Sequence, residues 1–309
     1  MNFGITTWAF FCLNPATLLI HMKKNFFLLI LLAIFSAVPT AYAIECDADT
    51  DGCVAIGEWQ VSVALGVGVR TNPVLDNDDI PLIVLPEISY NGERFFLQNL
   101  DMGFILIEDD VQQLNLLVTP SYDQVFFDRW DANNFILTAS ETLASPSFGP
   151  SAERLNLPVN TRQLRKRRMG GLAGFEYNRT LGSIDIQVHG LQEFTGFHQG
   201  QELHLAVAKS IRHGKHSMMF SAGANWQSSE VLNYYYGLEA GEGGSLDYQY
   251  QPGSGVSSVV RFDWNYHLNE RWSLRLVTAY RLLSSEIKNS PLVTDDKVIT
   301  AFAGGVYHF

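Results

Sequence analysis

The sequence has few charged residues, few basic residues and, beyond its N-terminal region, no long apolar run. Asp, Glu, Lys and Arg make up 17% of the 309 residues, below the roughly 25% usual for soluble domains. Lys and Arg together number 21 against 32 Asp and Glu, a balance that argues against nucleic acid as a partner. The lack of further apolar runs excludes a protein that spans a membrane with helices. Low charge with apolar residues at alternate positions instead favours a sheet with one lipid-facing side.

The apolar stretch near the N-terminus indicates export. Two lysines precede an apolar stretch at 26–38, and Ala41 to Ala43 has the small-x-small pattern of a cleavage site. We therefore expect a signal peptide at 22–43, with 1–21 as an upstream mis-start. The alternative is a membrane anchor, but this stretch is short for a spanning helix.

The acidic segment at 44–58 carries two further patterns. Cys46 and Cys53 are expected to form a disulfide, because the protein is exported. The same segment matches the calcium-loop pattern D-x-D-x-D-G-x5-E. Its potential ligands are Asp47, Asp49, Asp51 and Glu58. A strand follows the loop where a helix would be required, so the alternative is an acidic, disulfide-closed plug or tail.

The remaining chain shows the alternation of antiparallel strands. Residues 59–69 alternate apolar with small or polar side chains over a length that crosses a bilayer when tilted. The segments 256–268 and 271–283 place Phe, Trp and Tyr on one face and Arg, Asp and His on the other. This pattern is typical of lipid outside and a polar lumen inside. The last strand ends on Phe309 and would pair with the first strand, which removes both sheet edges.

We therefore predict an all-β fold, an antiparallel transmembrane β-barrel of about twelve strands over 59–309, with ten strands as the alternative. The predicted strands are 59–69, 81–90, 94–107, 111–126, 135–142, 169–179, 183–194, 202–211, 215–228, 256–268, 271–283 and 297–309. Short periplasmic turns and longer outer loops then make 127–134 the longest inner turn and 108–110 an outer loop. The strand at 135–142 has a poor pattern, and strands tolerate Pro86 and Pro120 badly.

Several short motifs follow one another in a specific order along the chain. They are Gly66–Gly68, the acidic turn at 76–79, Glu93–Leu97, Asn233-Tyr-Tyr-Tyr-Gly237, an acidic Gly/Tyr-rich loop, the strands around 269–272, Ser290–Val293 and Tyr307–Phe309. In this order the chain resembles the MipA/OmpV family of outer-membrane proteins over nearly all of 57–309, and it departs from the family at about 128–168.

The resemblance implies a non-enzymatic barrel in the outer membrane of a Gram-negative bacterium. One family member is described as a scaffold that brings a murein lytic transglycosylase together with a murein synthase, and others are treated as porin-like proteins or adhesins. A scaffold is therefore the first functional hypothesis, and a narrow channel or adhesin is the alternative.

Polar side chains on the inner faces of the predicted strands are candidates for the lumen lining. They are Asp185, His189, Glu193, Arg261, Asp263, His267, Arg275 and Arg281. A histidine near acids could also serve a lipid or lipopolysaccharide hydrolase, but no nucleophile signature such as G-x-S-x-G is present. No catalytic residue and no cofactor is therefore predicted.

Two clusters are candidates for surface contacts. Arg165, Lys166, Arg167 and Arg168 belong to the basic cluster of this acidic chain, and at the outer rim they could bind lipopolysaccharide phosphates or form a solvated loop. Arg129 and Trp130 in the predicted inner turn are residue types that anchor interfaces. They could bind a murein enzyme, or Trp130 could belong to the inner aromatic girdle.

Overall fold

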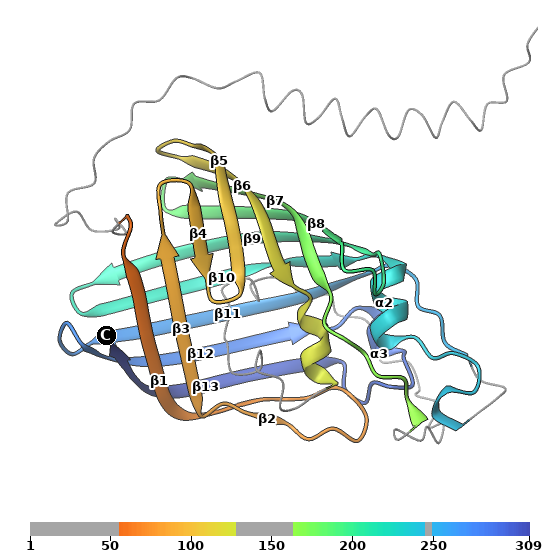
Figure 1. The fold of residues 1–309 in the computed structure, drawn as a ribbon. Helices are drawn as coiled ribbons and strands as arrows, with labels where there is room; N and C mark the ends of the chain where they lie inside the picture. The colour runs from red at the N-terminus through yellow and green to blue at the C-terminus, as the bar shows by residue number, and fades with distance from the viewer. Residues whose placement is uncertain (1–55, 128–162, 245–248) are drawn as a thin grey trace, which may run out of the picture. The chain divides into compact units, whose positions relative to one another are not determined.

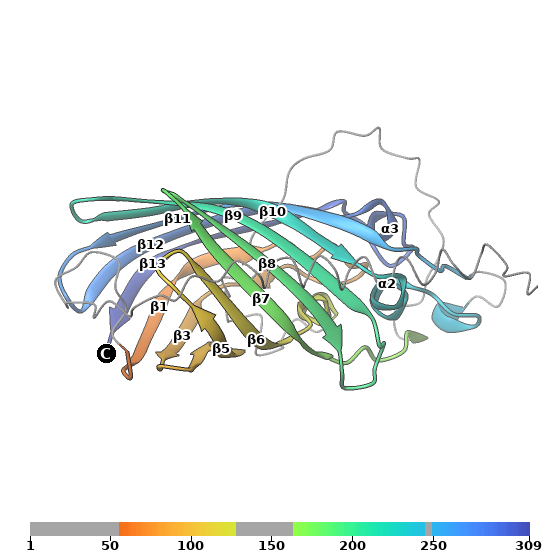
Figure 2. The same cartoon turned by 90° about the horizontal axis from the view of Figure 1, so that it is seen from above.

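The computed structural model describes residues 56–127, 163–244 and 249–309, which form one antiparallel sheet that closes on itself (Figures 1 and 2). The strands are β1 (Trp59–Arg70), β2 (Ile80–Pro81), β3 (Val84–Asn91), β4 (Phe95–Gln98), β5 (Asp101–Glu108), β6 (Gln112–Pro120), β7 (Gly171–Leu181), β8 (Ile184–Glu193), β9 (Gln201–His213), β10 (His216–Gln227), β11 (Gly255–His267), β12 (Trp272–Leu282) and β13 (Lys297–His308). The helices are η1 (Tyr122–Phe126), α2 (Ser229–Tyr236), η5 (Glu242–Gly244) and α3 (Ser285–Lys288). Among the described residues, no helix is long and apolar enough to cross a bilayer.

The barrel closes between its first and last strands. The pairing of β1 with β13 runs from Ser62 opposite His308 to Arg70 opposite Thr300. Each other strand pairs with its neighbour in the sequence, and β2 is only a two-residue pairing on β1. Counted without β2, the barrel has twelve strands, so the predicted fold and strand number are confirmed.

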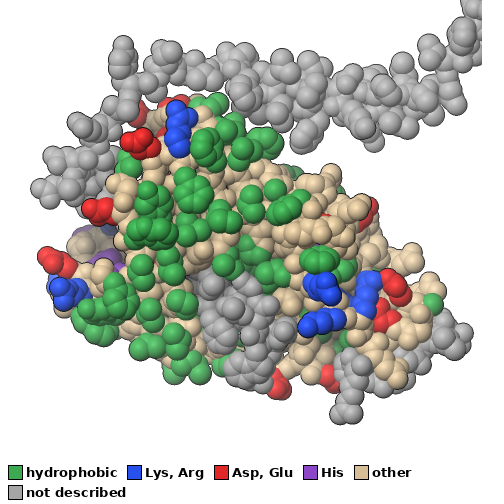
Figure 3. Space-filling view, in the orientation of Figure 1, with side chains coloured by type: hydrophobic (Ala, Val, Ile, Leu, Met, Phe, Trp, Pro, Cys, Tyr) green, Lys and Arg blue, Asp and Glu red, His purple; other side chains and the backbone are tan. Residues whose placement is uncertain are grey.

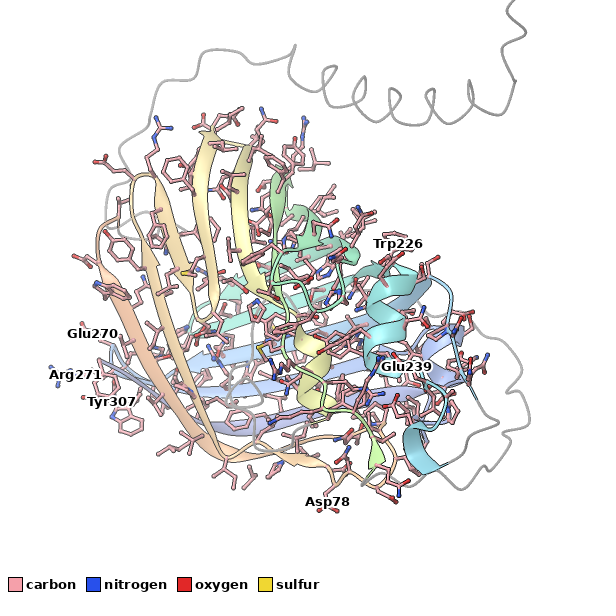
Figure 4. The ribbon with its side chains drawn as sticks, turned by 45° about the vertical axis from the view of Figure 1, so that its right-hand side comes forward. Asp78, Trp226, Glu239, Glu270, Arg271 and Tyr307 are labelled. Carbon is pink, nitrogen blue, oxygen red and sulfur yellow. The ribbon has the colours of Figure 1, made fainter. Side chains whose placement is uncertain are left out.

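The outer face is apolar and carries aromatic side chains at one end. On β1, Leu65 and Val67 are 60% and 77% exposed, as expected for side chains that face lipid. The aromatic pairs Trp59–Tyr90 and Trp272–Tyr307 each have ring centroids 5.0 Å apart. We call the end of the barrel where these pairs and Phe309 lie the terminal end, and the opposite end the loop end. Figure 4 shows Glu270, Arg271 and Tyr307 at the terminal end and Glu239 at the loop end.

The twelve strands are not the twelve predicted ones. The segment predicted as a single strand at 94–107 is divided into β4 and β5, because the chain turns at Asn99, whose φ is 56°. The connection at 109–111 therefore lies at the terminal end and is not an outer loop. The prediction of a strand between the fourth and sixth was also wrong: β6 pairs directly with β7, from Gln112 opposite Arg179 to Pro120 opposite Gly171.

The chain leaves the sheet at Pro120 and re-enters it at Gly171, and both residues lie at the loop end. Beyond Phe127, the predicted inner turn at 127–134 lies outside the described residues. The predicted strand at 135–142, together with Arg129 and Trp130, lies outside the described residues.

Both prolines occupy positions where the strand has no neighbour on their amide side. Because Gly66 N–H bonds to Ile83 C=O, the even-numbered residues of β3 point their amides away from β1. Pairing of β3 with β4 begins only at Ser89. At Pro86, β4 is therefore not paired with β3, and no hydrogen bond is lost because proline has no N–H. Pro120 likewise faces β5, whose pairing with β6 ends at Val118. The prolines therefore mark local sheet edges, where proline is tolerated.

The loop end of the lumen is filled by side chains. Phe126 of η1, Tyr236 of α2 and Ile287 of α3 are at most 2% exposed. They belong to one hydrophobic cluster with inward residues of the strands, such as Leu85 and Val277. We call this cluster the loop-end core. Figure 2 shows α2 and α3 together at this end of the barrel.

Candidate functional site

A belt of polar side chains crosses five neighbouring strands inside the lumen. Strand register aligns Asn115 of β6, Glu176 of β7, His189 of β8, His204 of β9 and Asn225 of β10. Period 2 places these positions on the same face of each strand. Asn115, Glu176 and His189 are 0%, 7% and 4% exposed, so the belt is buried inside the barrel.

The belt contains two carboxylate–histidine pairs. His189 Nε2 lies 2.9 Å from Oε2 of Glu176, and Oε1 of the same carboxylate accepts a 2.8 Å hydrogen bond from Asn115 Nδ2. His204 Nε2 lies 2.9 Å from Glu202. The rings of His189 and His204 stack with centroids 5.7 Å apart. Each buried charge therefore has a polar partner, as burial requires.

The helical turn η1 connects this belt to the loop-end core. Asp123 of η1 accepts hydrogen bonds from Gln227 Nε2 at 2.5 Å and from Arg281 Nη2 at 3.3 Å. Ser121, just before η1, donates to Glu202 at 3.4 Å. Polar bonds thus hold η1 to the inner face of β9, β10 and β12. A cavity of about 70 Å³ remains beside it, lined by His189, Glu202, His204, Asp123 and Arg281 among others. That volume has room for a few water molecules.

The other predicted lumen residues fall into two groups. Arg261 bonds Asp263 at 2.6 Å, and Arg275 bonds Glu87 of β3 at 2.8 Å, across the interior from β12. Asp185 and His267 are exposed near the terminal end.

Glu193 shares the buried alternation of His189 on β8, and its carboxylate bonds to the loop that follows the strand. Its carboxylate accepts the Thr195 hydroxyl and the backbone N–H groups of Phe197, His198 and Gln199. It therefore orders the loop between β8 and β9.

The basic run is divided by its extended backbone. Arg165 and Arg167 point inward, with side chains 33% and 1% exposed, whereas Lys166 and Arg168 are exposed. Arg167 Nη1 lies 3.0 Å from Glu242, and Arg165 pairs with Glu239. Of the four residues predicted to contact lipopolysaccharide, Lys166 and Arg168 are the two that face outward and could still bind a phosphate.

The inward arginines satisfy the C-terminal end of α2. Arg167 donates to the carbonyls of Tyr235 at 2.7 Å and Gly237 at 3.0 Å. Arg165 donates to the carbonyl of Asn233 at 2.8 Å. The last carbonyls of a helix lack intrahelical partners and carry partial negative charge, so cations stabilise them. We call this arrangement the arginine clamp.

Burial shifts the pKa values of side chains in the same region. Desolvation lowers the pKa of His198 below its usual value, although Glu193, Glu202 and Asp123 favour its charged form. Burial raises the pKa of the Tyr235 hydroxyl. Both groups are therefore neutral at pH 7.

The described residues form neither a catalytic triad at Ser273 nor a metal-binding group. Ser273 Oγ and His308 Nε2 lie 2.9 Å apart, but in these parts of the chain no carboxylate hydrogen-bonds to the other ring nitrogen of His308, as a triad requires. No group of three or more His, Cys, Asp or Glu side chains in the same residues could hold a metal ion. Cys46, Cys53, Asp47, Asp49 and Asp51 lie outside the described residues, and Glu58 is exposed before β1.

Sequence reasoning found the inward positions of β8, β11 and β12 but missed several partners. It did not single out Glu176, Glu202, His204, Asp123 or Glu242. Glu176, Glu202 and His204 occupy inward positions of β7 and β9, where every second residue faces the lumen. This alternation with the lipid-facing residues was the sequence signal that could have found them. Asp123 and Glu242 lie outside strands, where period 2 gives no information.

A closed antiparallel barrel with an apolar outer face, aromatic side chains at one end and a polar belt inside is an outer-membrane β-barrel. Among solved structures, the chain is similar to an outer-membrane channel from Pseudomonas putida F1, with 11% identity, a TM-score of 0.40, and coverage of 86% of this chain and 100% of that chain.

Residues 63–309 match the sequence model of the family described as MltA-interacting protein MipA, and the chain belongs to this family. It is 23% identical over 255 residues to outer membrane protein OmpV of Vibrio cholerae, covering 82% of this chain and 87% of that relative. It is 22% identical over 261 residues to MltA-interacting protein of Escherichia coli, covering 84% and 94%. The chain is accordingly an outer-membrane protein of a Gram-negative bacterium.

Proposed function

We propose that this barrel is a non-enzymatic scaffold that holds murein-remodelling enzymes at the outer membrane. The observation that carries the proposal is the closed loop end of the lumen, which the loop-end core and η1 fill with buried side chains. A barrel filled in this way suits a rigid anchor better than an open pore. The name of the Escherichia coli relative, MltA-interacting protein, supports a murein lytic transglycosylase as the first partner to test.

The terminal end is the side on which a murein enzyme would bind. Outer-membrane barrels have short periplasmic turns and longer outer loops, and the short turns of this barrel are at the terminal end. One hairpin there extends beyond its neighbour: pairing of β8 with β9 ends at Ala208, and all residues from Lys209 to His216 are exposed. No Asp or Glu occurs between Glu202 and Glu230. This basic hairpin is our candidate contact surface for an acidic region of a partner.

Crosslinking in intact envelopes, followed by pull-down and detection of murein lytic transglycosylases, tests the scaffold. Wild-type protein should capture the enzyme, and the double substitution Lys209→Glu and His213→Glu should reduce capture by about tenfold through like-charge repulsion. The matched control, Lys166→Glu with Arg168→Glu at the opposite end, should capture normally. Two further arms, deletion of 45–55 and Arg129→Ala with Trp130→Ala, test the contacts predicted from sequence. If wild-type protein captures no murein enzyme, the scaffold proposal is wrong.

A narrow channel is the alternative that the polar belt favours. The belt and the paired charges Arg275–Glu87 and Arg281–Asp123 supply a hydrophilic inner surface, and twelve strands give a barrel wider than the eight-stranded kind that side chains just fill. Planar-bilayer conductance separates the two functions. A scaffold with this lumen should show no steady conductance, and steady openings of the wild-type protein would favour the channel.

A further inference from the structure

The outward half of the basic run forms a cationic surface at the loop end. Lys166 and Arg168 are both exposed and lie on the same side of an extended segment, so their Cα atoms are about 7 Å apart. At this spacing both side chains can reach a single phosphate group. Figure 3 shows basic side chains gathered beside hydrophobic ones near this end of the molecule.

The charge of this outward pair is not neutralised within the described residues. Arg165 and Arg167 take up the nearby carboxylates, Glu239 and Glu242. Neither Lys166 nor Arg168 forms an ion pair with any described carboxylate. Two positive charges therefore face outward from a chain whose net charge is −11.

Aromatic side chains adjoin the two cations. The guanidinium carbon of Arg168 lies 5.8 Å from the ring centre of Phe197, which stacks on Tyr234 with centroids 6.5 Å apart. The Tyr234 hydroxyl accepts a 2.8 Å hydrogen bond from the Arg168 backbone N–H. Phe197 and Phe194 are 36% and 59% exposed. The surface thus combines fixed cations with exposed apolar area.

We propose that this surface binds the phosphorylated head of an outer-leaflet glycolipid, with Lys166 and Arg168 on one lipid A phosphate and Phe194 and Phe197 against its acyl chains. Clustered cations bind phosphate by short, charge-assisted hydrogen bonds. The neighbouring phenylalanines favour a lipid over a free phosphate, because exposed aromatic area next to a membrane lies against chains. The longer connections at the loop end put this surface on the outer side.

Titration of the folded barrel in detergent with bisphosphorylated lipid A tests the proposal. Lys166→Ala with Arg168→Ala should weaken binding about tenfold, since exposed charge pairs contribute up to about tenfold together. The matched control, Lys209→Ala with Arg271→Ala at the terminal end, removes the same charge and should bind as wild type does. Heat-modifiable gel migration checks that each variant is folded. If the double variant does not fold, the single variant Lys166→Gln, whose side chain has no bond in the described residues, should still weaken binding.

Four outcomes would overturn the assignment. They are equal binding by the double variant and wild type, an equal loss in the terminal-end control, equal affinity for dephosphorylated lipid A, and equal affinity for phosphatidylglycerol vesicles. The last would show that the surface does not select the glycolipid.

Discussion

The arginine clamp makes a local and measurable contribution to the stability of the loop end. Arg167→Met keeps most of the side-chain length but removes the guanidinium. The carbonyls of Tyr235 and Gly237 then lose their donors at 2.7 and 3.0 Å, and Glu242, whose side chain is 6% exposed, loses its 3.0 Å partner.

Removing one partner of a buried ion pair typically costs 3–5 kcal/mol. Arg165 Nε remains 3.8 Å from Glu242 and retains part of the compensation, so we take the lower end, about 3 kcal/mol. That free energy corresponds to an increase of about 100-fold in the population of locally opened molecules. The double variant Arg167→Met with Glu242→Gln should lose less than the sum of the single variants, because the two groups interact directly.

Hydrogen exchange of the folded barrel measures this opening. Amides of α2 and of 165–170 should exchange about 100-fold faster in Arg167→Met, whereas amides of β11, β12 and β13 should keep their wild-type rates. Lys166→Met removes an exposed neighbouring charge and should change nothing. Unchanged exchange in α2, or the same acceleration in Lys166→Met, would refute the clamp.

Two other predictions concern barrel closure and pH. Gly66→Val should prevent heat-modifiable migration, because a Cβ at Gly66 would lie 2.2 Å from Ala303 O on β13, whereas Gly190→Ala, with no atom within 4 Å of its Cβ, should migrate normally. The pKa of His198 is lowered in the fold, so the unfolded segment binds more protons and stability is lost as pH falls below the unfolded pKa of about 6.5. The protection factors of amides in the loop 194–200, which correct for the intrinsic exchange rate at each pH, should therefore be lower at pH 5 than at pH 7.5, and His198→Gln should remove that difference; an unchanged pH response in this variant would contradict the reasoning.

Period-2 alternation predicted most of the barrel because successive side chains of a spanning strand face different media. The β11 and β12 strands are clear examples, with aromatic residues outside and Arg261, Asp263 and Arg275 inside. The same signal failed at 94–107, since only Asn99 and Leu100 separate β4 from β5. Asn99, which adopts positive φ more readily than most residues, was the local sign of that turn.

Contacts inside the lumen needed the register and could not be predicted from one strand. Parity alone puts His189 on the inner face, but its pairing with Glu176 depends on how β7 aligns with β8. Arg281 bonds Asp123, which is 158 positions away in the chain and lies in a helical turn. Pro86 and Pro120 show the converse case. The sequence marks both as unfavourable in strands, but only the strand pairing explains why the barrel tolerates them.

The two proposed binding surfaces lie at opposite ends of the barrel, and the loop-end core lies between the glycolipid surface and the terminal end. If that core is rigid, substitutions at Lys166 and Arg168 cannot alter enzyme capture at the terminal hairpin through the lumen. The arginine clamp nevertheless joins the outer surface to α2, since Arg165 and Arg167 alternate with Lys166 and Arg168 on one segment. A glycolipid bound outside would therefore hold the clamp segment in place and slow hydrogen exchange in α2. Capture that changed with glycolipid in wild-type protein, but not in Arg167→Met, would show that the clamp couples the two ends.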